Sequence, residues 1–268
     1  MIIDGRALAE SVYAELVAAR AQIPRAIKLG VLTASHDPAI ESFVRIKTRA
    51  AAKLTIDMVR VETSEGVQTS ELLGEVERLA ARTDGIIVQL PLPSHIDCDR
   101  ILRGIPSGKD VDVLSPEAFG MFKAGGVIVP PVAAAIVLIL EHSTVKISGA
   151  RAVVVGEGRL VGKPAAIILK QRGASVISLK GGQDVASYTR DADIIVLGAG
   201  SSGILKPEMV KLGAVVIDAG TSELGGKLVG DADPLVAEKC TLFTPVPGGV
   251  GPVAVAMIFR NLFALIGK

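Results

Sequence analysis

Apolar runs bounded by turn residues alternate along the chain with stretches whose apolar positions recur every three or four residues. The runs are nearly continuous in Val, Ile and Leu, which is typical of strands covered on both faces of a parallel sheet, and the periodic stretches predict amphipathic helices. A strand and helix alternation of this kind indicates an α/β fold. The predicted strands are 28–33, 55–61, 85–89, 152–155, 175–179, 193–197 and 214–218, and the predicted helices include 8–19, 40–53 and 71–81.

Two breaks in the pattern suggest two lobes. Pro130–Pro131 follow a Gly-rich turn and precede a long apolar helix, and the segment 244–252 is too rich in Pro and Gly to be regular. The last apolar helix comes after that segment and can fold back onto the first half. The predicted domains are 1–130 plus 253–268, and 131–252.

Composition excludes several classes of protein. The chain has 268 residues and a formal net charge of +1, which gives no electrostatic reason to expect a nucleic-acid partner. The longest apolar stretch, 127–140, contains two prolines and is shorter than the about 20 residues of a membrane span. The N-terminus lacks the features of a signal peptide, and two distant cysteines do not make a disulfide framework. We therefore expect a cytoplasmic protein that does not bind membranes.

A glycine turn is the sharpest local motif. An apolar strand runs into Gly156, Gly158 and Gly162, and a helix with Pro164 in its first turn follows. Glycines let the main chain approach a pyrophosphate, and N–H groups at the helix start attract the anion. The spacing is one residue longer than the common fingerprint. The motif favours a dinucleotide site, and the alternative is a tight turn that binds nothing.

The next strand bears on which nucleotide is bound. It ends at Lys180, whereas NAD-specific proteins carry an acidic residue at this point. A cation suits a 2′-phosphate, and Arg159 offers a second one, but Glu157 in the turn argues the other way. We predict NADP, with NAD possible; the alternative for Lys180 is a solvated loop residue.

Three segments of the first half carry polar residues where a core strand or helix would be apolar. They are 36–47, in which Phe43 and Lys47 stand four apart, 85–93 with Gln89 at the end of a strand, and Lys-Asp-Val-Asp at 109–112. With the glycine turn and the segment Thr-Pro-Val-Pro-Gly-Gly-Val-Gly-Pro at 244–252, these motifs resemble, in the same order, the bifunctional methylenetetrahydrofolate dehydrogenase/cyclohydrolase family. The likeness covers nearly the whole chain.

The resemblance implies a fold, an activity and a set of site residues. The implied fold is an α/β lobe that binds folate and a Rossmann-type lobe that binds the nucleotide, usually in a homodimer joined through the Rossmann lobes. The implied activity is oxidation of 5,10-methylenetetrahydrofolate and hydrolysis of the product to 10-formyltetrahydrofolate. The implied residues are Lys47, Gln89 and Asp112 for catalysis, Phe43, Pro247, Gly248 and Gly249 for the substrate, and Gly156, Glu157, Gly158, Arg159, Val161, Gly162, Lys180 and Thr221 for the cofactor.

These residue types make chemical sense in the implied roles. A free lysine, with a pKa of about 10.4, is a poor general base near neutral pH, but burial lowers that pKa. Gln89 can orient the amine of Lys47 without adding charge, and Asp112 can accept a pair of N–H bonds from the pterin. The alternative interpretation makes Lys47 an exposed helix residue and Asp112 a turn cap.

Several positions depart from the family pattern. Phe43 stands in place of a tyrosine, which leaves the cyclohydrolase step in question, and Val113 replaces a glycine, so that the backbone there is expected to differ. Glu157 and Lys180 replace an arginine and a serine, which we interpret as one exchange of charge between turn and strand end. Two alternatives stay open: a dehydrogenase with weak or absent cyclohydrolase activity, and a folate- or nucleotide-binding protein without catalysis.

No metal site is predicted. The histidines at 36, 95 and 142 are scattered, and the segment 95–99 has ligand-type atoms without a familiar metal spacing. We expect that segment to be a surface loop.

Overall fold

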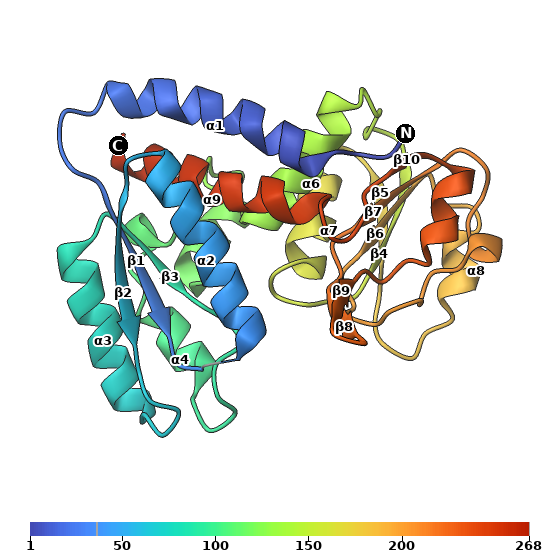
Figure 1. Ribbon diagram of the computed structural model, residues 1–268. Helices are drawn as coiled ribbons and strands as arrows, with labels where there is room; N and C mark the ends of the chain where they lie inside the picture. Colours follow the sequence, from blue (N-terminus) through green and yellow to red (C-terminus); the bar gives the residue numbers. More distant parts are fainter. Residues whose placement is uncertain (36, 268) are drawn as a thin grey trace. The chain divides into compact units, whose positions relative to one another are not determined.

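The computed structural model describes residues 1–35 and 37–267, and its contacts divide the chain into two compact units (Figure 1). Val12–Pro131 with Val255–Lys268 contains a three-stranded sheet, and we call it the three-stranded unit. Met1–Ser11 with Val132–Ala254 contains a five-stranded sheet, and we call it the five-stranded unit. The predicted two-part α/β class is confirmed. The predicted domain bounds stay a prediction; the contacts group residues 1–11 with the five-stranded unit instead.

The first sheet has three parallel strands in the order β2-β1-β3. Helix α3 approaches β1 closely because Gly30 has no side chain: a Cβ there would lie 2.6 Å from Leu79 Cγ. Since the strands are parallel, their carboxyl ends share one edge of the sheet. The elements are β1 (Lys28–Thr33), α2 (Pro38–Lys53), β2 (Asp57–Glu62), α3 (Thr69–Arg82) and β3 (Gly85–Val88).

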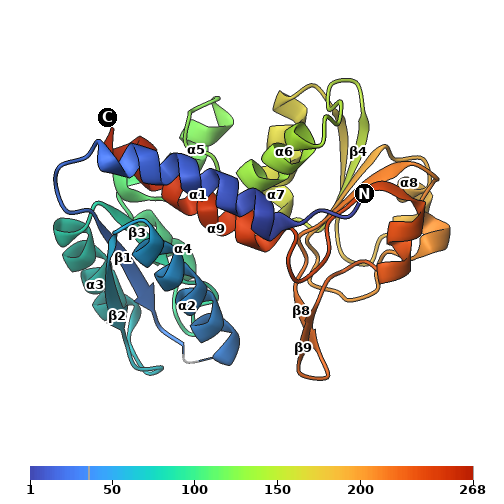
Figure 2. The same ribbon diagram turned by 45° about the horizontal axis from the view of Figure 1, so that its top comes forward.

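Four more helices surround this sheet or lead to and from it: α1 (Gly5–Ala21), α4 (Cys98–Arg103), α5 (Pro116–Lys123) and α9 (Val250–Ile266). Helix α1 buries Leu8, Val12 and Leu16 as predicted, whereas Ala19, expected on the same face, is exposed. Within the three-stranded unit α1 and α9 run side by side (Figure 2), and Arg260 pairs with Glu15 at 2.7 Å.

The second sheet has five parallel strands in the order β10-β7-β6-β4-β5, and α6 and α7 cover one face while α8 covers the other (Figure 1). The N-terminal residues extend this sheet, because Ile3 N donates a hydrogen bond of 2.9 Å to Phe243 O in β10. The elements are α6 (Pro131–His142), β4 (Arg151–Val155), α7 (Gly162–Gln171), β5 (Ser175–Leu179), α8 (Val185–Thr189), β6 (Ile194–Leu197), β7 (Ala214–Asp218) and β10 (Cys240–Phe243).

All seven predicted strands are present, each within two residues of its predicted bounds. An antiparallel hairpin of β8 (Ser222–Leu224) and β9 (Lys227–Val229) was not predicted, because strands of three residues are too short to show an alternating pattern. In the described part of the chain, no helix is long and apolar enough to cross a membrane.

Candidate functional site

A lysine occupies the buried face of helix α2. Ile40, Val44 and Ala51 form this face, and Lys47 lies among them with only 8% of its surface exposed. Its Nζ donates a hydrogen bond of 2.6 Å to Gln89 Oε1. Because burial penalises the charged amine, the pKa of Lys47 is lowered from its ordinary value of 10.5. The interpretation as a buried lysine is confirmed, and the exposed-residue alternative is wrong.

The amide of Gln89 is held in one orientation at the carboxyl edge of the three-stranded sheet. Its main-chain N donates a hydrogen bond of 2.9 Å to Leu32 O, which continues the pairing of β3 with β1. Its Nε2 donates a bond of 2.9 Å to Leu90 O, so that Oε1 is left to accept from Lys47. The glutamine therefore directs the lysine amine without bringing a charge to it.

Asp112 completes this group through its charge. Burial raises the pKa of Asp112 to about 6; the positive charge of Lys47 opposes the rise, and the negative charge of Asp110 adds to it. The Asp112 charge in turn opposes the lowering of the Lys47 pKa. The capping role in this turn belongs to Asp110, whose Oδ2 accepts a hydrogen bond of 2.6 Å from Ser115 N. The fold thus brings an amine, an amide and a carboxyl together from three segments.

The segment that carries Asp112 is anchored by Lys109 of the same motif and by Asn261, which sequence patterns did not single out. Lys109 Nζ donates to Ala80 O at 2.5 Å and to Thr83 O at 2.7 Å, where helix α3 ends. The buried Asn261 of α9 donates a bond of 2.9 Å to Val111 O. These bonds satisfy carbonyl groups and fix the main chain just before Asp112.

Val113 keeps a conformation that suits glycine. Its φ is +58°, in the left-handed region that β-branched residues rarely adopt, and its side chain is 1% exposed. That the backbone here differs from that of family members with glycine stays a prediction. The cost of this conformation, about 1–3 kcal/mol, must be offset by the packing around it.

The four predicted folate-binding residues belong to different units. Phe43 lies one turn before the buried lysine of α2 and is 39% exposed. Pro247, Gly248 and Gly249 belong to the five-stranded unit, where Gly5 N donates a hydrogen bond of 2.9 Å to Gly248 O. Their contacts with folate stay predictions.

The glycine turn joins β4 to α7 at the carboxyl edge of the five-stranded sheet. Packing requires glycine at two positions: a Cβ on Gly162 would lie 1.9 Å from Gly156 O, and one on Gly156 would lie 2.5 Å from Gly198 O. Gly158 differs, since the nearest atom to a Cβ there would be 3.9 Å away. The space beside Gly158 is therefore open, just before helix α7 begins, and a pyrophosphate can approach the main chain there. The residues present therefore fit a dinucleotide.

Two opposite charges lie beside this turn. Lys180 Nζ, just after β5, is 3.6 Å from Glu157 Oε2 in the turn, and both side chains are well exposed. In this chain the two residues form an ion pair, and the exchange of a phosphate-binding charge between turn and strand end stays a prediction. Arg159 and Thr221 are exposed and Val161 is half-buried. The contacts of all these residues with a nucleotide stay predictions.

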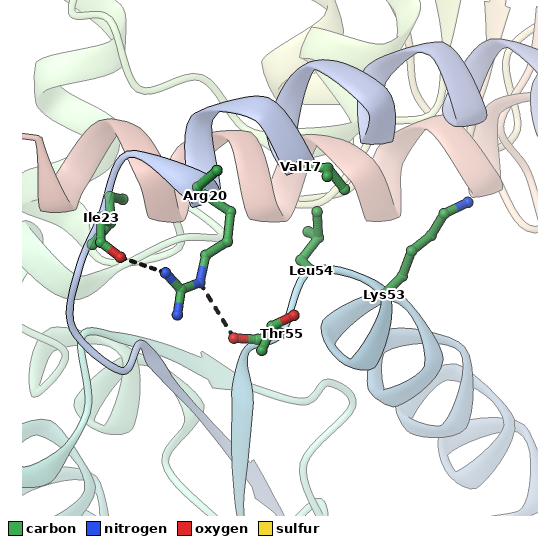
Figure 3. Close-up of a pocket in the computed structure, with 7 residues that line it drawn as sticks. Val17, Arg20, Ile23, Lys53, Leu54 and Thr55 are labelled. Atoms are coloured by element: carbon green, nitrogen blue, oxygen red, sulfur yellow. Dashed lines mark hydrogen bonds between the residues drawn. The ribbon is translucent and has the colours of Figure 1, made fainter.

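A separate pocket lies where helices α1 and α2 end (Figure 3). Arg20 Nη1 donates a hydrogen bond of 2.6 Å to Ile23 O, and its Nε donates one of 3.3 Å to Thr55 O. Both carbonyls precede strands of the three-stranded sheet, so the pocket is at the edge opposite Gln89. The guanidinium ties two entering loops together, and this explains its place without a ligand.

In the part of the chain that the structure describes, no group of three or more His, Cys, Asp or Glu side chains is placed to hold a metal ion. His36 lies outside the described residues. The segment 95–99 is not wholly a loop, because Asp97 caps helix α4, which begins at Cys98. Burial raises the pKa of the free Cys240 thiol to about 11, which keeps it protonated.

Two buried carboxylates near the glycine turn were not among the predicted site residues. Asp218 ends β7 and is 1% exposed, and Asp231 is 0% exposed. Each accepts hydrogen bonds from main-chain N–H groups. One signal was visible: Asp218 directly follows the apolar run 214–217, and polar residues at the carboxyl ends of parallel strands often mark a site.

These features define a class: an α/β protein of two units, one with a dinucleotide-binding turn and the other with a buried lysine, glutamine and aspartate. Residues 3–112 match the family model for the tetrahydrofolate dehydrogenase/cyclohydrolase catalytic domain, and residues 130–268 match the model for the NAD(P)-binding domain of the same enzymes.

Individual relatives agree. Bifunctional protein FolD of Methanococcoides burtonii is 38% identical over 273 residues, which cover 97% of this chain and 94% of the relative. The crystal structure of the bifunctional FolD enzyme from Campylobacter jejuni is 33% identical with a TM-score of 0.93, covering 100% of this chain and 98% of that one. The Trypanosoma brucei enzyme, solved with NADP and an inhibitor, is 35% identical with a TM-score of 0.95, covering 100% and 97%.

The chain belongs to the tetrahydrofolate dehydrogenase/cyclohydrolase family. The resemblance noted in the sequence is thereby confirmed. The five-stranded unit contains most of the NAD(P)-binding match, and the three-stranded unit contains most of the catalytic-domain match. The protein is a bifunctional enzyme, a dehydrogenase and cyclohydrolase of a tetrahydrofolate substrate.

Proposed function

We propose that this enzyme oxidises 5,10-methylenetetrahydrofolate with NADP and hydrolyses the methenyl product to 10-formyltetrahydrofolate, with Lys47, Gln89 and Asp112 as its catalytic residues. One observation carries the assignment of residues: the 2.6 Å bond between Lys47 and Gln89, beside the carboxyl of Asp112. A buried amine with a lowered pKa has no structural purpose that an apolar residue would not serve better.

The oxidation is mainly a matter of positioning. The nucleotide, when bound, supplies a nicotinamide ring that takes a hydride from the methylene carbon. For this step the chain orients the folate: the carboxylate of Asp112 accepts two N–H bonds from the pterin, and the exposed ring of Phe43 offers a surface for stacking.

The hydrolysis uses the amine of Lys47. Because burial lowers its pKa, this amine gives up its proton more readily than an ordinary lysine, and in its neutral form it can take a proton from a water molecule. The water oxygen then bonds to the methenyl carbon as a hydroxyl group. A carbon–nitrogen bond of the substrate breaks, the protonated amine returns its proton to the leaving nitrogen, and the hydroxyl releases its proton to solvent as the formyl C=O forms. Gln89 Oε1 keeps the amine oriented through this exchange.

Lys180 is the residue proposed to distinguish NADP from NAD. Its ion pair with Glu157 must open when a 2′-phosphate binds. An exposed pair of this kind contributes only about 0–1 kcal/mol, whereas a hydrogen bond to a charged group contributes about 1.5–3 kcal/mol. NADP therefore binds more tightly, and NAD remains an acceptable, weaker cofactor.

Phe43 supports a second candidate, a dehydrogenase with weak or absent cyclohydrolase activity. The phenyl ring keeps a stacking surface but has no hydroxyl to donate or accept a hydrogen bond. Decay of the methenyl absorbance with and without enzyme separates the two candidates. If the second is right, Phe43→Tyr increases the rate of hydrolysis.

We further propose a cytoplasmic homodimer that acts in one-carbon metabolism. Two features support the dimer: β5 is an edge strand of the five-stranded sheet, and Ile177 in β5 is 47% exposed. Light scattering of the purified enzyme tests it, and a monomer mass at micromolar concentration would contradict it. Cys98 and Cys240 form no disulfide, which fits a reducing compartment.

A paired assay tests the whole proposal. The enzyme is supplied with methylenetetrahydrofolate and either NADP or NAD, and both reduction of the nucleotide and hydrolysis of the methenyl product are followed. We expect turnover with both cofactors and faster turnover with NADP. Binding of both ligands in a calorimeter without any turnover would instead identify a non-catalytic binding protein.

A further inference from the structure

Asp218 and Asp231 are buried in the five-stranded unit, and the hydrogen bonds that reach their carboxylates come from main-chain N–H groups. Removing a carboxylate from water costs several kcal/mol unless hydrogen bonds replace its hydration. A fold that keeps two such groups needs them for something other than stability. The bonds that each accepts show which part of the chain depends on it.

Asp231 holds the loop that follows β6. Its Oδ2 accepts hydrogen bonds of 2.7 Å from Ala199 N and 3.1 Å from Gly200 N, and its Oδ1 accepts one of 2.7 Å from Ser201 N. Three consecutive N–H groups can converge on one carboxylate only when the main chain curves around it. The carboxylate therefore determines the curvature of this loop.

The same loop rests directly on the glycine turn. Gly198, which opens the loop, donates a hydrogen bond of 2.9 Å to Val155 O in β4. A Cβ on Gly198 would lie 2.3 Å from Val161 Cγ1, and one on Gly156 would lie 2.5 Å from Gly198 O. Since no space separates the two segments, a change in the loop must displace the turn.

Asp218 holds a second loop and interlocks with Asp231. Its Oδ1 accepts a hydrogen bond of 3.0 Å from Gly220 N, and its Oδ2 accepts one of 2.8 Å from Ala232 N. A Cβ on Gly220 would lie 2.1 Å from Asp231 Cγ, and one on Gly230 would lie 2.2 Å from Asp218 Oδ2. Each carboxylate thus packs on a glycine beside the other aspartate.

We propose that Asp218 and Asp231 are positioning residues for nucleotide binding: they hold the loops after β6 and β7 in the shape that lets the glycine turn receive the dinucleotide. The inference rests on the proposed nucleotide site. An ionised carboxylate is required because it only accepts hydrogen bonds; an asparagine would turn an NH₂ group toward N–H donors that it cannot accept from.

The decisive variant is Asp231→Asn. We expect it to weaken NADP binding, measured by calorimetry, by about tenfold or more, as for the loss of one hydrogen bond to a charged group. Hydrolysis of supplied methenyltetrahydrofolate without any nucleotide should stay within about twofold of the wild-type rate, because it depends on Lys47 in the other unit. Asp218→Asn should show the same split, which provides a second test if Asp231→Asn does not fold.

Two controls make the outcomes distinct. Asp233→Asn removes a nearby carboxylate that caps a different segment through Leu235 N and should leave NADP binding unchanged. Gly158→Val fills the open space in the turn and should abolish NADP binding. If both aspartate variants bind NADP normally and Gly158→Val does not bind it, the positioning role is overturned but the nucleotide site is supported. Normal binding by Gly158→Val overturns the site itself. Equal loss of NADP binding and hydrolysis in the aspartate variants shows a merely structural role.

Discussion

The group around Lys47 in the three-stranded unit and the pair Asp218 and Asp231 in the five-stranded unit bury charged groups in different ways. In the three-stranded unit, Lys47 contacts another side chain, Gln89, and the pKa of Lys47 is lowered while that of Asp112 rises to about 6. In the five-stranded unit, Asp231 accepts three hydrogen bonds from main-chain N–H groups and Asp218 accepts two. Both arrangements are costly, so neither exists for stability alone.

The difference lies in the partners. A side-chain amide or carboxyl can move, and the groups near it can exchange protons with a substrate. A main-chain N–H neither titrates nor moves without the loop that contains it. The first arrangement is therefore suited to chemistry, and the second is suited to holding a shape. The predictions below test this distinction.

The largest effect is expected at Lys47. Lys47→Met removes the proposed general base and should reduce the rate of hydrolysis by about 10²–10⁴-fold. The free energy of unfolding should stay the same or rise, because an apolar side chain suits this buried position better than an amine. Lys53→Met, on the exposed end of the same helix, is the control and should hydrolyse normally. If Lys47→Met hydrolyses the substrate at the wild-type rate, the group around Lys47 does not serve chemistry.

The raised pKa of Asp218 leads to a prediction of how the free energy of unfolding changes with pH. Burial raises its pKa from the ordinary 3.8 to about 6 in the folded chain. Between about pH 4 and 6 the folded chain keeps a proton that the unfolded chain has released, so stability falls as the pH rises through this window. The fall attributable to Asp218 is about 3 kcal/mol, since a tenfold change in proton affinity corresponds to about 1.4 kcal/mol.

Urea unfolding of the wild type and of Asp218→Asn across that window measures this effect. The difference between their unfolding free energies should change by about 3 kcal/mol in favour of the variant as the pH rises. Because Asp112 titrates in both proteins, its contribution cancels in the difference. A difference that is independent of pH would mean that Asp218 does not carry the proton.

Lys180 provides a further test within the five-stranded unit. It pairs with a side chain, that of Glu157, whereas Asp218 and Asp231 of the same unit accept hydrogen bonds from main-chain N–H groups. Lys180→Ala should weaken NADP binding by about 1–3 kcal/mol and leave NAD binding nearly unchanged. Glu157→Gln frees the lysine and should strengthen NADP binding by up to about 1 kcal/mol. Lys170→Ala, an exposed lysine of α7, is the control in the calorimeter. Equal losses for both nucleotides would show that Lys180 does not recognise the 2′-phosphate.

The smallest effect, on the free energy of unfolding, is expected at Val113, whose main chain has a strained positive φ. Val113→Gly loses apolar burial of about 1.5–3 kcal/mol but relieves about 1–3 kcal/mol of strain at φ +58°. It should therefore be no less stable than Val113→Ala. At the buried Val111 the order should reverse, with glycine less stable than alanine by about 0.5–1 kcal/mol. Chemical denaturation of the four variants checks both orders.

Much of the fold could be predicted because its signals are local. Continuous apolar runs identified the strands, and three- and four-residue spacing identified helices such as α2. The short hairpin of β8 and β9 was missed because six strand residues in all carry no usable period. The contacts group residues 1–11 with the five-stranded unit, and no local pattern could show this, because Ile3 N bonds to Phe243 O near the other end of the chain.

For the candidate site, the sequence by itself determined which residue types are present and in which motifs: Lys47 on an apolar helix face, a glycine turn after a strand, and opposite charges at Glu157 and Lys180. The tertiary structure alone decided the partners. Lys47 meets Gln89 across 42 positions, and Asp231 reaches Ala199 across 32. The physical reason is that hydration and hydrogen bonding set the properties of a charged group, and both depend on neighbours in space that no local pattern records.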